Sequence, residues 1–238
     1  MTDDQVAARL ATEAGDLLVG MRSAGGTEGD WRSNELLLRR LAELRPDDAV
    51  LSEEHVDDGA RLTHRRVWII DPLDGTREYG EPPRDDWAVH VALAVDGQPV
   101  AGAVSLPAAG LVYGTGTPPE VPPSIGGPVR LAVSRTRPPA CVDTLVARLG
   151  ARLVPMGSAG AKAMAIIRGD VDIYAHSGGQ YEWDSCAPVA VAASAGLHVS
   201  RLDGSPLRYN APNPYLPDLL ICRPELAGAV IDALRPGS

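Results

Sequence analysis

Apolar residues recur every three or four positions in the N-terminal segment, which indicates two consecutive helices. The first helix is predicted over residues 4–22, and the Gly25-Gly26 pair ends its pattern. The second is predicted to begin after a Ser33 cap and to stop before Pro46. The chain therefore opens with helical structure, and its strands are expected further on.

Alternating and continuous apolar runs then predict strands. Short strands are expected at residues 49–52 and 66–71, and pairing of the second should stop there because Pro72 has no amide hydrogen for a sheet ladder. Residues 87–106 alternate around a central Asp-Gly pair, which predicts a β-hairpin.

Residues 114–128 are dense in Gly and Pro, which predicts a boundary between two halves, residues 1–128 and 129–238. After this boundary, strands and helices alternate. Strands are expected at 129–134, 152–155, 171–175 and near His198 and Leu219, and helices at 138–149, 158–168, 184–195 and from Pro224 onward. Such alternation predicts an α/β fold with helices layered on sheets.

Composition narrows the class of protein. The net charge of −9 and the pI near 5.0 argue against non-specific binding to nucleic acid or to an anionic membrane. No apolar run reaches transmembrane length and the first residues do not resemble a signal peptide, so a cytoplasmic protein is expected. Of the 22 basic residues only Lys162 is a lysine, which makes it a candidate for a specific contact.

The run Asp71–Thr76, with the sequence Asp-Pro-Leu-Asp-Gly-Thr, carries the main chemical signal. Asp71 and Asp74 are separated by two residues in a turn, so their carboxylates can converge on a cation. The amides of Gly75 and Thr76 can hold an anion. The alternative for the run alone is an ordinary turn with a helix cap.

Two further places supply oxygen ligands. Glu53 and Glu54 follow a predicted strand, and Asp184 begins a predicted helix. Taken singly, paired glutamates are typical of a solvated loop and such an aspartate of an N-terminal charge. Their combination with Asp71 and Asp74 favours a metal site.

These motifs together resemble the inositol monophosphatase superfamily. The matching residues stand in family order: Ser52-Glu53-Glu54, the run 71–76, Trp183-Asp184-Ser185-Cys186-Ala187 and Ala195-Gly196. The resemblance implies the sugar-phosphatase fold, with alternating α-β-α-β-α layers and mixed sheets. It also implies a Mg²⁺-dependent, lithium-sensitive phosphatase, expected to be a homodimer acting on a small phosphorylated molecule.

The residues that follow the metal motif resemble the CysQ-type bisphosphate nucleotidases within this superfamily. Arg77-Glu78-Tyr79 is similar to their Lys-Glu-Phe, and Gly157–Lys162 to their Gly-Ser-Ser-Leu-Lys with one residue inserted. The implied reaction is hydrolysis of 3'-phosphoadenosine 5'-phosphate to AMP and phosphate. The implied substrate-binding residues are Arg77, Ser134, Arg135, Gly157, Ser158 and Lys162, with Arg137 as an alternative to Arg135. An inositol-1-phosphatase or fructose-1,6-bisphosphatase with the same metal chemistry is the competing hypothesis.

The resemblance also implies roles for the acidic cluster. Glu53, Asp71 and the Leu73 carbonyl would bind one Mg²⁺, and Asp71, Asp74 and Asp184 a second. A third ion would be held through Glu53. The implied catalytic residues are Thr76, Glu53 and Asp74, and the implied phosphate-binding residues are Gly75 and Thr76.

One departure from the family pattern concerns the partner of Thr76. Many members have an aspartate on the second helix that supports this threonine, and the corresponding place here is expected to be Asn34, with Asp30 as the alternative. An asparagine there would favour a different hypothesis, a catalytically silent metal-binding protein. The five histidines are scattered and are expected to be structural or solvated.

Overall fold

The computed structural model describes residues 1–235, which form two five-stranded sheets. The first sheet has the order β1-β2-β3-β4-β5 and the second β7-β6-β8-β10-β9. The strands of the first are Ala49–Ser52 (β1), Arg66–Asp74 (β2), Ala88–Val95 (β3), Gln98–Leu106 (β4) and Leu111–Gly114 (β5). Those of the second are Arg130–Ser134 (β6), Arg152–Met156 (β7), Ile173–Tyr181 (β8), His198–Ser200 (β9) and Tyr215–Cys222 (β10). Both sheets mix parallel and antiparallel pairs.

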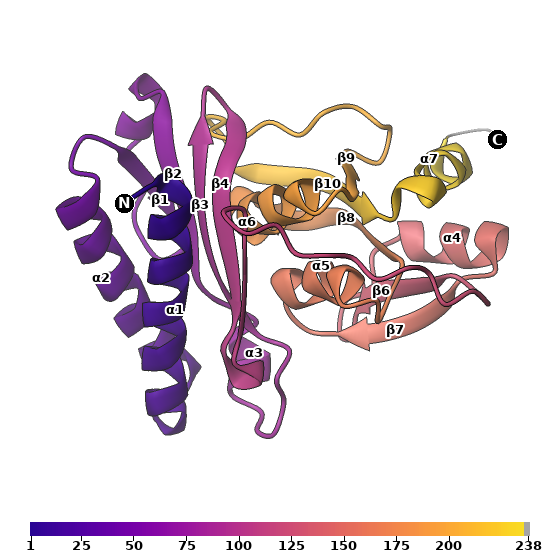
Figure 1. The fold of residues 1–238 in the computed structure, drawn as a ribbon, viewed down its shortest axis with the longest axis horizontal. Coiled ribbons are helices and arrows are strands. Elements are labelled where there is room, and N and C mark those ends of the chain that lie inside the picture. Colours follow the sequence, from indigo (N-terminus) through magenta and orange to yellow (C-terminus); the bar gives the residue numbers. More distant parts are fainter. Residues whose placement is uncertain (236–238) are drawn as a thin grey trace.

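Helices cover both sheets and separate them. The α-helices are Asp3–Met21 (α1), Gly26–Leu44 (α2), Thr76–Tyr79 (α3), Cys141–Leu149 (α4), Ala159–Ile167 (α5), Glu182–Ser194 (α6) and Ala227–Leu234 (α7). Helices α1 and α2 pack on the outer face of the first sheet, α5 and α6 lie between the sheets, and α4 and α7 pack together beyond the second sheet (Figure 1). The predicted α-β-α-β-α layering is confirmed.

The second helix begins earlier than predicted. Helix α2 starts at Gly26, so Ser33 lies inside it and its hydroxyl donates to the Pro72 carbonyl at 2.8 Å. Packing explains the difference, because a Cβ on Gly26 would lie 2.5 Å from the Thr76 side chain, and one on Gly29 would lie 3.1 Å from both Leu18 and Tyr79. The glycines that resembled a helix stop instead allow α2 to approach the strand end closely.

Strand β2 continues past the point where it was predicted to stop. It pairs with β3 through Asp71, shifts register across Pro72, and pairs again at Asp74 opposite Ala88. The irregularity accommodates the missing proline amide without ending the strand. As a result both aspartates are held by the sheet, and Asp71 is almost completely buried.

The two sheets share one apolar core. Helices α5 and α6 contact strands of both sheets, and a single buried cluster joins side chains from before and after residues 114–128. The three cysteines, Cys141, Cys186 and Cys222, are buried and free. No helix in residues 1–235 is both long enough and apolar enough to span a bilayer.

Candidate active site

The turn after β2 carries the first group of site residues. Gly75 has φ +87°, a left-handed conformation that glycine adopts at little cost, and it directs the chain from β2 into the short helix α3. A side chain there would also lie 3.3 Å from the Ser158 Cβ. The turn therefore brings Asp74 and Gly75 against the start of α5.

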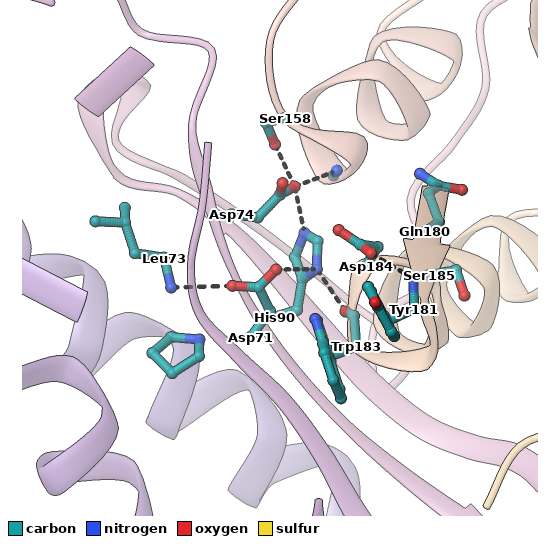
Figure 2. Close-up of polar contacts among 12 residues, drawn as sticks. Asp71, Leu73, Asp74, His90, Ser158, Gln180, Tyr181, Trp183, Asp184 and Ser185 are labelled. Carbon is teal, nitrogen blue, oxygen red and sulfur yellow. Dashed lines mark hydrogen bonds and ion pairs between the residues drawn. The ribbon is translucent and has the colours of Figure 1, made fainter. Parts of the chain in front are cut away.

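Protein donors fix one oxygen of three carboxylates in the cluster. The Oδ2 of Asp74 accepts from the Ser158 hydroxyl and from the Gly160 amide at 2.7 Å. The Leu73 amide donates to Asp71 Oδ1 at 3.1 Å, and the Tyr181 amide donates to Asp184 Oδ2 at 2.6 Å (Figure 2). Within residues 1–235 the second oxygen of each carboxylate accepts no hydrogen bond, which leaves three oriented oxygens for cations.

The carboxylates are electrostatically strained without a cation. Burial, followed by repulsion from Glu53 and Asp74, raises the pKa of Asp71 well above its ordinary value. Burial and the neighbouring Asp74 raise the pKa of Asp184 to about 6. Glu53 reaches solvent, yet partial burial and the nearby Asp184 raise its pKa to about 8. Hard divalent cations would remove this repulsion, so the donor set fits them.

His90 is a site residue that the sequence reasoning missed. It is fully buried on β3, with Nδ1 3.0 Å from the Trp183 carbonyl and Nε2 3.2 Å from Asp74 Oδ2. Burial opposes its protonation, but Asp74 outweighs burial and raises the pKa of His90. His90 therefore lies within ion-pair distance of Asp74 and helps to position it. Its nitrogens also lie close enough to Asp71 and Asp74 to be considered as metal ligands. A histidine at the centre of an apolar strand was the signal for it.

The pKa of Asp74 is lowered, whereas the pKa values of Asp71 and Asp184 are raised, because Asp74 lies beside His90. Burial alone would raise it, but His90, Lys162 and the Ser158 hydroxyl outweigh burial and hold the pKa of Asp74 below its ordinary value. Asp74 is therefore the carboxylate of the cluster that the protein itself keeps ionised.

Asp30, not Asn34, supports Thr76. The Thr76 hydroxyl lies 2.9 Å from Asp30 Oδ2 and 3.2 Å from the Leu73 carbonyl, whereas Asn34 accepts a hydrogen bond from Ser52. The expectation for Asn34 is wrong because α2 begins at Gly26, which turns the face carrying Asp30 toward α3. Burial raises the pKa of Asp30 to about 7.

A single cavity of about 580 Å³ contains almost all the predicted site residues. Its lining includes Glu53, Asp71, Leu73, Asp74, Gly75, Thr76, Arg77, Ser134, Gly157, Ser158, Lys162 and Asp184. Of the site residues predicted from the sequence, Arg135 is not in this lining; its guanidinium is paired with Glu78 and Glu81 at 2.6 and 2.7 Å. Arg137, the alternative, does line the cavity.

The cavity has two chemically distinct parts. Glu53 follows β1, Asp71 and Asp74 lie on β2, and Asp184 lies in the first turn of α6. Arg77, Arg137 and Lys162 bring positive charge to the same cavity. Lys162 is buried, and its ammonium donates to the carbonyls of Gly157 and Ser158 at 2.8 and 2.7 Å. One cavity thus offers both a cation site and groups that attract an anion.

Comparison with known proteins identifies the family of this fold and site. The model of the inositol monophosphatase family matches residues 23–117 and 125–235, so the chain belongs to that family. The family is metal-dependent, which agrees with the acidic cluster.

Particular relatives are also similar over most of the chain. A protein of Mycobacterium tuberculosis named 3'-phosphoadenosine 5'-phosphate phosphatase is 55% identical over 94% of this chain and 91% of its own length. The 3'(2'),5'-bisphosphate nucleotidase CysQ of Escherichia coli K12 is 28% identical over 80% of this chain and 81% of its own. Among solved structures, Mycobacterium tuberculosis SuhB superposes with a TM-score of 0.74 at 26% identity, covering 97% of this chain and 94% of that one.

Proposed function

We propose that this protein is a Mg²⁺-dependent phosphomonoesterase that hydrolyses 3'-phosphoadenosine 5'-phosphate to AMP and phosphate. The observation that carries the proposal is the two-part cavity, in which converging carboxylates and cationic side chains line one space. A nucleotide with two phosphates needs both parts, one for the reacting phosphate and one for the other. The name of the relative that is 55% identical supports the same substrate.

The proposed metal ligands are the carboxylates of Glu53, Asp71, Asp74 and Asp184 and the carbonyl of Leu73. These are hard oxygen donors, which suit Mg²⁺ better than softer metals, and we propose that they hold two or three ions. Bound there, Mg²⁺ would neutralise charge on the phosphate oxygens and make an attacking water more acidic.

The chain's own residues would prepare the reaction in two ways. Thr76, held by Asp30 at 2.9 Å, would accept a hydrogen bond from the attacking water and orient it toward phosphorus. The amides of Gly75 and Thr76 would donate to the phosphate oxygens as charge develops on them. Ionised carboxylates at Glu53 and Asp74 would complete the catalytic set. No covalent phosphoenzyme is required.

The proposed contacts for the rest of the nucleotide line the same cavity. Arg77 and Lys162 would supply positive charge, and Ser134, Gly157 and Ser158 would supply polar contacts. Arg137 replaces Arg135 in this set, because the Arg135 guanidinium is already paired with Glu78 and Glu81. The family resemblance also leads us to propose a lithium-sensitive, cytoplasmic homodimer.

A phosphate-release assay with Mg²⁺ tests the proposal. We expect kcat/KM for 3'-phosphoadenosine 5'-phosphate to exceed that for inositol 1-phosphate and for fructose 1,6-bisphosphate by at least about tenfold, which is roughly 1.4 kcal/mol of barrier. The same assay with EDTA is the metal control. A preference for inositol phosphate by the same factor would contradict the proposal.

A further inference from the structure

His176 is a cavity residue without an assigned role. It lies on β8 and lines the same cavity as the carboxylates. Both of its ring nitrogens are buried, and neither has a hydrogen-bond partner within residues 1–235. Buried polar groups in folded proteins are almost always paired, so an unpaired ring in the wall of a cavity requires an explanation.

A neighbouring polar side chain on this strand, that of Tyr174, does have a hydrogen-bond partner. Tyr174 lies two positions earlier, so it shares a face of β8 with His176, and their ring centroids are 6.4 Å apart. The Tyr174 hydroxyl is paired with Gln180 at 2.6 Å. The fold therefore pairs the buried tyrosine internally, whereas both ring nitrogens of the cavity-lining His176 are left without a partner in the described part of the chain.

The ring lies in a positive environment. Burial, together with the charges of Lys162 and Arg137, lowers the pKa of His176 to about 4, so the ring is neutral at pH 7 and carries one N–H donor. The nearby Gly178 backbone raises this pKa, but less than burial and the two cations lower it. It makes no hydrogen bond of standard geometry with the ring. Arg137 and Lys162 line the same cavity and can only donate.

A ligand group that satisfies all three side chains must accept several hydrogen bonds and carry negative charge. A phosphate meets both conditions, whereas a sugar hydroxyl brings no negative charge to balance Arg137 and Lys162. We propose that His176 is a specificity residue that donates a hydrogen bond to the second, non-reacting phosphate of the nucleotide. The inference rests on the proposed function, because it presupposes a substrate with two phosphates.

Two substitutions of His176 separate this role from a structural one. His176→Phe keeps the ring and removes both nitrogens, and His176→Asn keeps a neutral donor in a smaller side chain. We expect His176→Phe to lower kcat/KM for 3'-phosphoadenosine 5'-phosphate about tenfold, and His176→Asn to retain more of it. For adenosine 3'-phosphate, which has the reacting phosphate but not the second one, both variants should stay within about twofold of the parent enzyme.

Binding of AMP gives an independent measurement. AMP keeps the second phosphate, so it should raise the melting temperature of the parent enzyme more than that of His176→Phe, while adenosine should not distinguish them. His198→Phe is the matched control, since His198 lies on β9 and is hydrogen-bonded to Ser200. It should leave the ratio of the two substrates unchanged.

The outcomes distinguish this inference from the proposed function. Equal losses on both substrates in His176→Phe, or an unchanged AMP shift, would overturn the role of His176 while leaving the bisphosphate activity intact. If His176→Phe does not fold, an equal loss on both substrates in His176→Asn overturns it instead. A parent enzyme that does not prefer the bisphosphate over adenosine 3'-phosphate would also overturn the role of His176, whereas the proposed function fails if inositol phosphate is the preferred substrate.

Discussion

Among single residues, Lys162 is the one whose interpretation the structure changes most. From the sequence it was a candidate for direct contact with the nucleotide. In the structure its ammonium donates to two consecutive carbonyls, and Ser158, the second of these residues, has φ +36°. A non-glycine residue in that region costs about 1–3 kcal/mol and persists only when its surroundings hold it. Lys162 thus stabilises the turn whose serine hydroxyl donates to Asp74.

We therefore predict that Lys162→Met lowers kcat about tenfold even for adenosine 3'-phosphate, because losing the two hydrogen bonds loosens Ser158 and with it Asp74. Steady-state kinetics on this substrate measure the effect. Arg168→Met, a change at an exposed ion pair just after α5, is the control. If Lys162→Met affects only substrates with a second phosphate, Lys162 acts through its charge and not through the turn.

The sequence identified the residues of the site better than it identified their partners. Short-range motifs located Asp71, Asp74 and Thr76 because the turn chemistry is local. The pairing of Thr76 with Asp30, and of His90 with Asp74, joins positions far apart in the chain. Such pairs depend on how α2 and β3 pack against β2, which no local pattern specifies.

At the level of helices and strands, hydrophobic periodicity predicted most elements and tertiary packing changed their ends. The alternation around residues 87–106 predicted β3 and β4 with their turn. The sequence pattern did not predict the short edge strand β5, whose residues lie in a Gly-rich stretch. It also ended strand β8 too early, because the polar residues after Ala175 pair with β10. Because β8 continues to Tyr181, it carries His176 and Gln180 to the wall of the cavity.

One buried ion cluster joins elements of the second sheet. Asp172, just before β8, accepts hydrogen bonds from the Arg130 backbone and guanidinium on β6 and from the Arg223 guanidinium after β10, at 2.8–3.0 Å. Burial would raise the pKa of Asp172, but its pairing with Arg130 outweighs burial and lowers the pKa below the ordinary value. The ionised form is therefore the stabilising one.

We predict that Asp172→Ala destabilises the protein by about 3–5 kcal/mol at pH 7, because it leaves two arginines without their buried partner. Since the folded-state pKa is depressed, the contribution is present above the unfolded pKa and is lost as pH falls through the folded one. The difference between parent and variant in urea unfolding should therefore shrink below about pH 4. Glu28→Ala, which breaks an exposed pair with Arg32, should cost less than about 1 kcal/mol. A difference that stays constant at low pH would contradict this assignment.

For the molecule as a whole, the acidic cluster connects the two sequence halves. Glu53, Asp71 and Asp74 precede residues 114–128, and Asp184 follows them, so the carboxylates are brought together only when both sheets pack on α5 and α6. The division of the chain into halves 1–128 and 129–238 remains a proposal. The core that the two sheets share argues that both halves fold cooperatively. Repulsion within the cluster opposes that folding until cations bind.

We predict that Mg²⁺ stabilises the whole fold and that Asp71→Asn removes most of the effect. At a concentration about 100 times its Kd, a ligand of the folded state contributes about 2.7 kcal/mol, which for a chain of this length is a rise in Tm of roughly 5–10 °C. In EDTA, Asp71→Asn should unfold at or above the parent's temperature, because it removes a repelled charge and its amide oxygen can still accept from the Leu73 amide. Thermal unfolding of both proteins with and without Mg²⁺ measures this, and Asp96→Asn, at an exposed turn, should respond to Mg²⁺ like the parent. A parent protein whose Tm ignores Mg²⁺ would show that the carboxylates do not form the metal site.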